Sequence, residues 1–169
     1  MLHAEIVAAA NQLLDLCRRK KLTIATAESC TGGLIAGALT DIPGSSRVLD
    51  RGFVTYSNAA KEEMLGVPHD ILKQYGAVSR EAAEAMARGT LGYAPVDLSI
   101  AVTGIAGPTG EEGGKPIGLV HFAAASRSGL LMLAEKRFGN PGRAEIRKRS
   151  VLQGFAMLLD LAEKEPARR

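Results

Sequence analysis

The stretch DLSIAVTG, residues 97–104, decides the fold class of this chain. It is a nearly continuous apolar run, which is typical of a strand buried on both faces of a parallel sheet. The run TIATA at residues 23–27 has the same β-rich character and ends in a polar, glycine-rich turn. A third run, VLDRGFVTYS at residues 48–57, also predicts a strand. The chain therefore contains several strands, and what lies between them decides how they are connected.

Segments with helical periodicity separate these strands. Residues 4–19 carry apolar positions at helical spacing, and the basic cluster RRKK follows where the helix dipole favours cations. Further helical patterns cover residues 34–39, which Pro43 and Gly44 stop, residues 58 to about 75, residues 81–88 behind the N-cap Ser79, and residues 143–163.

The second half of the chain adds a hairpin. The runs GLVHFAAAS and LLMLAEKRF flank the short turn SRSG, a pattern that predicts two antiparallel strands. Strands that alternate with helices favour a parallel sheet covered on both faces. We therefore predict an α/β fold, a three-layer α/β/α sandwich with a mixed sheet of about five strands.

Length and composition exclude several classes of protein. The chain has 169 residues, a net charge of +3, 46% apolar and 23% charged residues, which predicts one folded domain over residues 1–169 and excludes a disordered or fibrous chain. It holds no run near the roughly 20 apolar residues of a membrane span, and its start lacks a signal-peptide pattern. Cys17 and Cys30 suggest no disulfide framework. We expect a cytoplasmic protein without a membrane partner.

Three unusual motifs follow the predicted strands. They are AESCTGG at residues 27–33, VTYSNAAK at residues 54–61 and VTGIAGPTG at residues 102–110. Ligands of open α/β sheets bind outside the carboxyl ends of the parallel strands. The three motifs should therefore meet at one site.

The first motif places Ser29 and Cys30 between a strand and a glycine-rich helix start. Free N–H groups at such a helix terminus would suit a phosphate or an oxyanion. The alternative is a polar turn whose serine only caps the helix. The motif matches neither the dinucleotide fingerprint nor the P-loop.

The second motif contains Lys61. Desolvation at a strand end would lower the pKa of such a lysine and let it act as the general base for a serine. The alternative is an ordinary exposed lysine beside Glu62 and Glu63. Ser45 and Ser46 of PGSS either relay a proton between Lys61 and Ser29 or form a turn.

The third motif begins a long glycine-rich loop, residues 105–116. Thr103 and the amides of residues 104–107 form a possible ligand nest, although the loop could also be a mere connection. The glycines at the strand ends suggest close approach of a ligand to the backbone. His3, His69 and His121 show no paired spacing, so we expect neither a metal site nor a cofactor.

A basic segment precedes and enters the last helix. Arg143 and Arg147 stand four residues apart on one predicted helix face, a spacing that suits a phosphate monoester. The alternative is a solvated basic face. A nucleic-acid partner is less favoured, because no aromatic residues interleave with the basic ones.

Taken together, these motifs resemble the C-terminal domain of the competence/damage-inducible protein CinA. The resemblance rests on TAESCTGGLIAGALTDIPGSS, GFVTYSNAAKEEMLGV, YGAVSREAAEAMA and VTGIAGPTG with GKPIGLVHFA, and it runs from about residue 22 to residue 159. The family is known for nicotinamide mononucleotide deamidase activity. The resemblance implies a metal-free hydrolysis of the carboxamide, which yields nicotinic acid mononucleotide and ammonia.

The resemblance also implies roles for single residues. Ser29 would be the nucleophile and Lys61 the base, and a serine of PGSS would assist, for which we choose Ser46 over Ser45. The substrate, a small nucleotide, would be bound by residues of all three motifs and of the last helix: Thr31, Gly32, Tyr56, Thr103, Gly104, Arg143 and Arg147. Before the last helix the family often has Gly-Asp-Arg or Gly-Asn-Arg, whereas this chain reads GNPGR.

Three alternatives stay open at this point. A thiolate at a helix N-terminus is readily activated, so Cys30 is a rival nucleophile. The chain could also be a nucleotide-binding or regulatory module without catalysis, or a protein associated with nucleic acid. In each case the Ala/Gly-rich surface suggests that copies of the chain form a homo-oligomer.

Overall fold

A computed structural model describes residues 3–110 and 113–169 of the chain. Two residues of the glycine-rich loop, 111 and 112, lie outside the described residues. The helices are α1 (Ala4–Lys20), α2 (Leu34–Thr40), α3 (Asn58–Leu65), α4 (His69–Tyr75), α5 (Arg80–Tyr93) and α6 (Arg143–Lys164), with a short 3-10 helix η1 (Ser45–Arg47). The strands are β1 (Ile24–Glu28), β2 (Leu49–Val54), β3 (Leu98–Gly104), β4 (Leu119–Ser126) and β5 (Leu131–Arg137).

The five strands form one mixed sheet in the order β2-β1-β3-β4-β5. Strand β1 runs parallel to both β2 and β3, whereas β4 is antiparallel to β3 and to β5. The predicted hairpin is therefore confirmed as β4 and β5, and it is what makes the sheet mixed. The predicted α/β class and the number of strands are confirmed as well.

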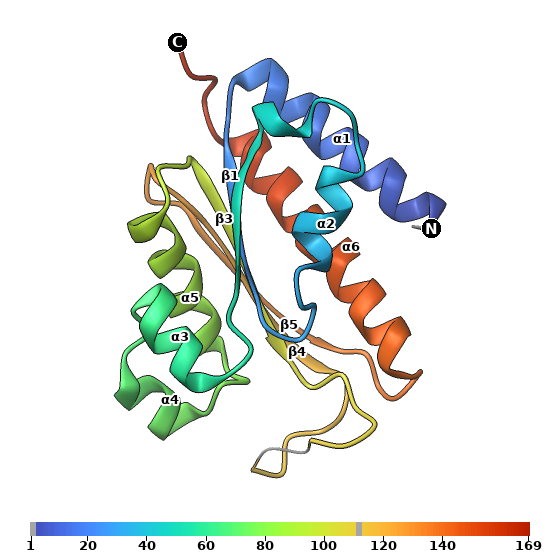
Figure 1. Cartoon of the computed structure of the whole chain (residues 1–169), viewed down its shortest axis with the longest axis vertical. Helices are drawn as coiled ribbons and strands as arrows, with labels where there is room; N and C mark the ends of the chain where they lie inside the picture. The colour runs from blue at the N-terminus through green and yellow to red at the C-terminus, as the bar shows by residue number, and fades with distance from the viewer. Residues whose placement is uncertain (1–2, 111–112) are drawn as a thin grey trace.

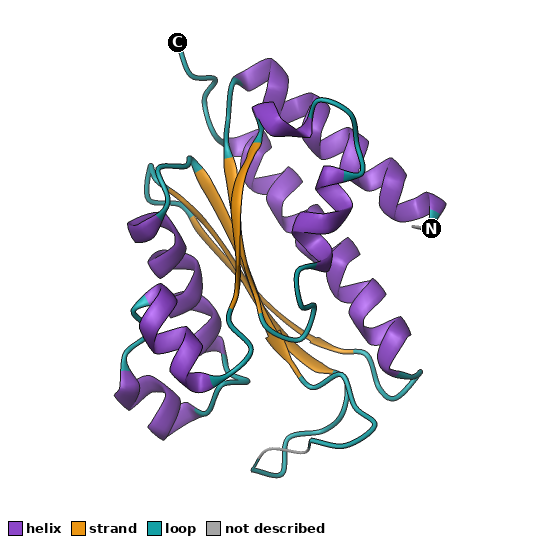
Figure 2. Ribbon diagram, viewed as in Figure 1, coloured by secondary structure: helices purple, strands orange, loops and turns teal. Residues whose placement is uncertain are grey.

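Helices cover both faces of this sheet. Helices α1, α2 and α6 lie on one face, and α3, α4 and α5 lie on the other (Figures 1 and 2). The first face holds the larger side chains, with Leu13 of α1 and Phe155 of α6 fully buried against the strands. The second face is rich in alanine, so α5 packs close to β3 and β4 through thin side chains. This is the predicted three-layer sandwich.

Burial explains where the strand predictions were accurate. Strand β1 is buried along its whole length and β3 almost so, because both are interior strands with a helical layer on each side. Strand β2 lies at the edge of the sheet and is largely exposed, and it ends at Val54 rather than at residue 57. Residues 55–57 leave the sheet, and Ser57 becomes the N-cap of α3.

The topology brings three chain segments to one end of the sheet. Because β1, β2 and β3 run in the same direction, the segments that follow them leave from the same edge (Figure 1). Helix α6 begins beside them, after the chain returns from β5. Within the described residues, no helix is long and apolar enough to cross a membrane.

Candidate active site

Ser29 and Lys61 meet at this end of the sheet. The Nζ atom of Lys61 lies 3.0 Å from the Oγ atom of Ser29. Ser29 directly follows β1, and Lys61 lies in α3, which follows β2. Two of the three predicted strand-end motifs thus place their reactive groups in hydrogen-bond contact.

Lys61 is a buried side chain, with an exposed fraction of 1%. Its Nζ atom donates to the carbonyl oxygen of Thr55 at 2.7 Å and lies 3.4 Å from that of Tyr56. The helix that carries it is fixed at its start, where the Oγ atom of Ser57 accepts a hydrogen bond from the amide of Ala60. The alternative of an ordinary exposed helical lysine is therefore wrong.

A cavity of about 280 Å³ opens beside the two residues. Its walls come from all three strand-end segments, from the connection between α4 and α5, and from the start of α6. The lining residues are Ser29, Cys30, Tyr56, Ser57, Asn58, Lys61, Ala77, Val78, Thr103, Gly104, Ile105, Ala106, Gly107, Thr109, Gly110 and Arg143. Of the predicted site residues, Thr31, Gly32, Ser46 and Arg147 are not among them.

Glu28 occupies the start of α2, where the sequence suggested either a site for an anion or a capped polar turn. Its buried carboxylate accepts hydrogen bonds from the amides of Ile35 and Ala36, at 2.8 and 3.0 Å, and from the hydroxyl of Thr26. The helix terminus is therefore satisfied from within the chain, and we correct the expectation that it is free for a phosphate or an oxyanion. The sequence does carry a signal for this contact, namely Glu28, whose carboxylate stands directly before Ser29.

Cys30 lines the cavity, but its thiol is protonated at neutral pH. Burial raises the pKa of the Cys30 thiol to about 12, from an ordinary value of 9.0. The rival nucleophile would need the thiolate. Because the thiol is buried and neutral, the structure favours Ser29 over Cys30.

Ser46 and Ser45 lie far from this cluster. They form η1, which precedes β2, and the amide of Ile24 at the start of β1 bonds to Val48 just after it. The length of β1, at about 3.3 Å per residue, thus separates Ser46 from Ser29 by roughly 16 Å. We correct the expectation of a proton relay, because no side chain of PGSS spans that distance and Lys61 contacts Ser29 directly.

Thr103 and Gly104 line the cavity from the end of β3. The hydroxyl of Thr103 donates to the carbonyl oxygen of Ala77 at 2.7 Å, so it holds the connection between α4 and α5. A Cβ at Gly104 would lie 2.8 Å from the carbonyl oxygen of Leu119 and 2.7 Å from the side chain of Val120. This glycine allows close packing of β4, and because it also lines the cavity its part in substrate binding stays a prediction.

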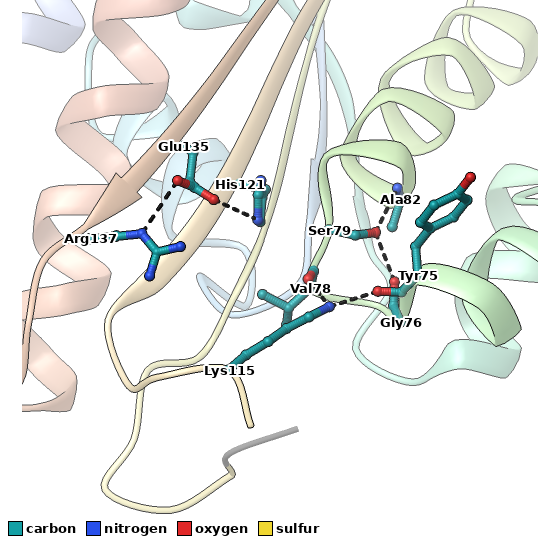
Figure 3. A network of polar contacts seen from close by, with 9 residues as sticks. All are labelled: Tyr75, Gly76, Val78, Ser79, Ala82, Lys115, His121, Glu135 and Arg137. Carbon is teal, nitrogen blue, oxygen red and sulfur yellow. Dashed lines mark hydrogen bonds and ion pairs between the residues drawn. The ribbon is translucent and has the colours of Figure 1, made fainter. Parts of the chain in front are cut away.

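Lys115 does not line the cavity, but it contacts the segment between α4 and α5 that does (Figure 3). Its Nζ atom donates to the carbonyl oxygens of Tyr75, at 2.6 Å, and Val78, at 2.5 Å. Beside it, Glu135 of β5 lies 3.7 Å from His121 of β4, whose pKa burial lowers. The glycine-rich loop is thus fastened by its far end to the segment that lines the cavity.

The two predicted phosphate ligands have different surroundings. Arg143 lines the mouth of the cavity, where it donates through Nη1 to the carbonyl oxygen of Gly107 and through Nη2 to the hydroxyl of Tyr56, at 2.8 and 3.2 Å. Arg147 donates instead to the carbonyl oxygens of Cys30 and Thr31, both at 3.1 Å. The two residues share a helix face, but only Arg143 reaches the cavity.

Other basic residues of this segment are paired with carboxylates. Lys148 contacts Glu5, and Arg149 contacts Glu145. Basic residues that are paired in this way are typical of a solvated helix face, and they favour that interpretation over a surface that binds nucleic acid. In the described part of the chain no cluster of three His, Cys, Asp or Glu side chains could hold a metal ion.

A family model for the CinA C-terminal domain matches residues 7–162. The chain belongs to the CinA C-terminal domain family. The chain matches a solved structure of this family, the competence/damage inducible protein CihA from Agrobacterium tumefaciens, with a TM-score of 0.93 and 48% identity, over 95% of this chain and 98% of that one. The predicted resemblance to the CinA family is therefore confirmed.

Curated relatives of this CinA-family chain carry three kinds of name, of which putative competence-damage inducible protein is one. The protein named nicotinamide-nucleotide amidohydrolase PncC, from Enterobacter agglomerans, is 52% identical over 121 residues, which cover 72% of this chain and 74% of that protein. A CinA-like protein from Akkermansia muciniphila is 48% identical over 148 residues, or 88% of this chain but 36% of that protein. The chain spans about a third of the length of most such relatives. That residues 1–169 form a single domain stays a prediction.

Proposed function

We propose that the chain is a nicotinamide-nucleotide amidohydrolase that converts nicotinamide mononucleotide and water to nicotinic acid mononucleotide and ammonia. One observation carries this proposal: the buried amine of Lys61 lies 3.0 Å from the hydroxyl of Ser29 at the wall of a cavity. The relative named PncC supports the choice of substrate. The reaction would recycle a pyridine nucleotide.

Lys61 is placed to accept the proton of Ser29. Burial disfavours a charged ammonium, so the amine can be neutral in the resting site. The carbonyl oxygens of Thr55 and Tyr56 can only accept hydrogen bonds, and they take N–H groups of that amine. In its neutral form this amine could accept the proton of the Ser29 hydroxyl, which lies 3.0 Å away.

Acylation begins when the Oγ atom of Ser29 attacks the carboxamide carbon and its proton passes to Nζ of Lys61. The amide oxygen becomes an oxyanion in this step. The backbone N–H of Cys30, beside the nucleophile, and those of Ala106 and Gly107 across the cavity are the candidates to stabilise it. The tetrahedral intermediate then breaks its C–N bond, Lys61 returns the proton to the departing nitrogen, and ammonia leaves an acyl ester on Ser29.

Deacylation repeats these steps with water. Lys61 takes a proton from a water molecule, whose oxygen attacks the ester carbon. Collapse of the second intermediate breaks the bond to Oγ of Ser29, and Lys61 returns the proton to that oxygen. The product is the carboxylic acid, which releases its proton to solvent as the carboxylate, and no cofactor or metal enters the sequence of steps.

Arg143 is the residue that we assign to the substrate phosphate. It stands at the mouth of the cavity, and two of the five N–H groups of its guanidinium serve Gly107 and Tyr56. The remaining N–H groups can bind phosphate oxygens, for which the planar guanidinium is well suited. The aromatic ring of Tyr56, which is 63% exposed, lies beside the entrance.

The test is ammonia release from nicotinamide mononucleotide, with chromatographic detection of the acid product. Ser29→Ala should abolish turnover, and nicotinamide riboside, which lacks the phosphate, should be a poor substrate. Undiminished turnover by Ser29→Ala would exclude the assigned nucleophile. Binding of the mononucleotide without ammonia release would instead identify a nucleotide-binding module without catalysis.

Two further parts of the proposal concern location and assembly. We place the protein in the cytoplasm, because its two cysteines are free and buried, as in a reducing compartment. We also expect a homo-oligomer, to be checked by light scattering after gel filtration. A monomer at micromolar concentration would contradict the second expectation.

A further inference from the structure

Arg147 stands behind the loop that carries Ser29, on the side away from the cavity. It borders a separate hollow of about 170 Å³ together with Leu34, Ala38 and Val151. Its Nη2 atom would lie 3.4 Å from a Cβ at Gly32, so the guanidinium packs directly against the loop backbone. A phosphate in the cavity would therefore have this loop between itself and Arg147.

The contacts of Arg147 fix the backbone immediately after the nucleophile. Its Nε atom donates to the carbonyl oxygen of Cys30 and its Nη2 atom to that of Thr31, both at 3.1 Å. A rigid planar group thereby holds two neighbouring carbonyls, which restricts the orientation of the Cys30–Thr31 and Thr31–Gly32 peptide planes.

This loop needs such a support. Gly32 and Gly33 adopt positive φ angles of 59° and 97°, so the loop turns sharply between β1 and α2. Glu28 fixes the start of α2 beyond the loop, and Lys61 contacts the Ser29 side chain. Arg147 is the side chain that fastens the backbone between these two points.

We propose that Arg147 is a positioning residue for Ser29 and makes no contact with the substrate phosphate. This inference rests on the proposed function and deepens it, because it divides the two arginines of α6 between two tasks. Arg143 would determine affinity for the phosphorylated substrate, and Arg147 would determine the rate of attack by Ser29. A misplacement of a reacting group by about 1 Å can cost on the order of 100-fold in rate.

Steady-state kinetics of three matched variants test the division. Arg147→Met should lower kcat roughly 10- to 100-fold with KM within about threefold. Arg143→Met should raise KM at least about tenfold, and Arg149→Met, on the exposed side of the same helix, should change neither constant. In Arg147→Ala, added methylguanidinium should restore part of the lost kcat, which a loss of folded protein would not allow. A rise in KM for Arg147→Met equal to that for Arg143→Met would overturn the proposal.

Calorimetry in a Ser29→Ala background separates this inference from the proposed reaction. Loss of Arg147 should leave the Kd of the mononucleotide within about threefold, and loss of Arg143 should weaken it at least tenfold. Tenfold weakening by Arg147→Met would again overturn the inference.

If the wild-type protein neither binds nor hydrolyses the mononucleotide, the proposed function fails by itself. The positioning role is then measured as the rate at which phenylmethanesulfonyl fluoride modifies Ser29, followed by mass spectrometry. Modification should be slower in Arg147→Met than in wild type and unchanged in Arg149→Met. Equal modification of wild type and Arg147→Met, including none in both, overturns the inference.

Discussion

The Nζ atom of Lys61 contacts the Oγ atom of Ser29 at 3.0 Å, although 32 positions separate the two residues in the chain. The contact exists because β1 and β2 are parallel neighbours, so the segments that follow them leave from one edge of the sheet. Burial of the lysine bears on its chemistry, since burial disfavours the charged ammonium and only a neutral amine can accept the proton of the serine.

Removal of either partner should abolish hydrolysis. We expect Ser29→Ala and Lys61→Met each to lower kcat at least about 1000-fold, because the nucleophile and its base act as one unit. For the same reason the double variant should lose little more than either single one. The measurement is ammonia release, and Lys73→Met, a change of the same type at an exposed position of α4, is the control.

Cys30→Ala should keep most of the activity. With a pKa of about 12, only on the order of one thiol in 10⁴ is ionised at pH 8, so Cys30 is a poor nucleophile. We expect kcat within about threefold of wild type, since the substitution removes one sulfur atom from the cavity wall. Alkylation of Cys30 by iodoacetamide should also be slow in the folded protein and fast in urea. Loss of turnover in Cys30→Ala, with Ser29→Ala still active, would reverse the assignment.

The two buried thiols should make the protein less stable in alkaline solution. Burial raises the pKa of Cys17 and of Cys30 to about 12 from 9.0. Above pH 9 the unfolded chain releases these protons while the folded protein retains them, so the free energy of unfolding falls as pH rises toward 12. From pH 8 to pH 10 the loss should be roughly 1 kcal/mol for each thiol.

Urea unfolding at the two pH values measures this loss. The variant with both Cys17→Ala and Cys30→Ala should show a smaller fall in unfolding free energy between pH 8 and pH 10 than wild type. Other groups also titrate in this range, so the comparison between the two proteins is the decisive quantity. An identical fall in both would show that the thiols ionise in the folded state as easily as in the unfolded one.

Much of this site could be predicted from local sequence, and the exceptions have physical reasons. Apolar runs predicted the buried strands, and the direction of parallel strands predicted that the segments after them meet. Periodicity could not decide whether Lys61 is buried, because that depends on how α3 packs against α5 and β2. Ser46 precedes β2, whereas Ser29 follows β1. Because these two strands are parallel, the order alone predicts that the two serines lie at opposite ends of the strands.

Glu28 shows the other limit of local sequence. A carboxylate beside Ser29 is as compatible with catalysis as with structure, and only its hydrogen bonds to Ile35 and Ala36 decide between them. Gly104 shows the same limit. The strand that leaves no space for a side chain there is β4, which follows only after a long loop, so local sequence does not reveal the contact. Tertiary neighbours, which a sequence pattern does not name, determined both outcomes.

Glu28→Gln should reduce both stability and activity. The carboxylate accepts from two amides of α2 and from Thr26, and an amide side chain would place an N–H group against one of these donors. We expect the free energy of unfolding to fall by about 1–3 kcal/mol, as for other buried hydrogen bonds to a charged group. Because Ser29 follows directly, kcat should fall as well at temperatures where the variant is folded. An unchanged midpoint in urea would mean that the buried carboxylate adds no stability to the start of α2.

Lys115→Met should loosen the wall of the cavity without touching the reacting groups. The lysine holds the carbonyl oxygens of Tyr75 and Val78 (Figure 3), and Val78 lines the cavity that contains Ser29. The change should raise KM several-fold and leave kcat within about threefold, because only the binding surface becomes less well ordered.

Hydrogen exchange provides the structural readout for this variant. Amides of residues 76–79 should exchange faster in Lys115→Met, whereas amides of β1 should not change, because Lys115 makes its contacts with the connection between α4 and α5. Thr103→Val removes the other hydrogen bond to this connection, from the Thr103 hydroxyl to Ala77, and should have an effect in the same direction. Unchanged exchange together with an unchanged KM would mean that the wall keeps its shape without Lys115, and that the loop after β3 is fastened there for another reason.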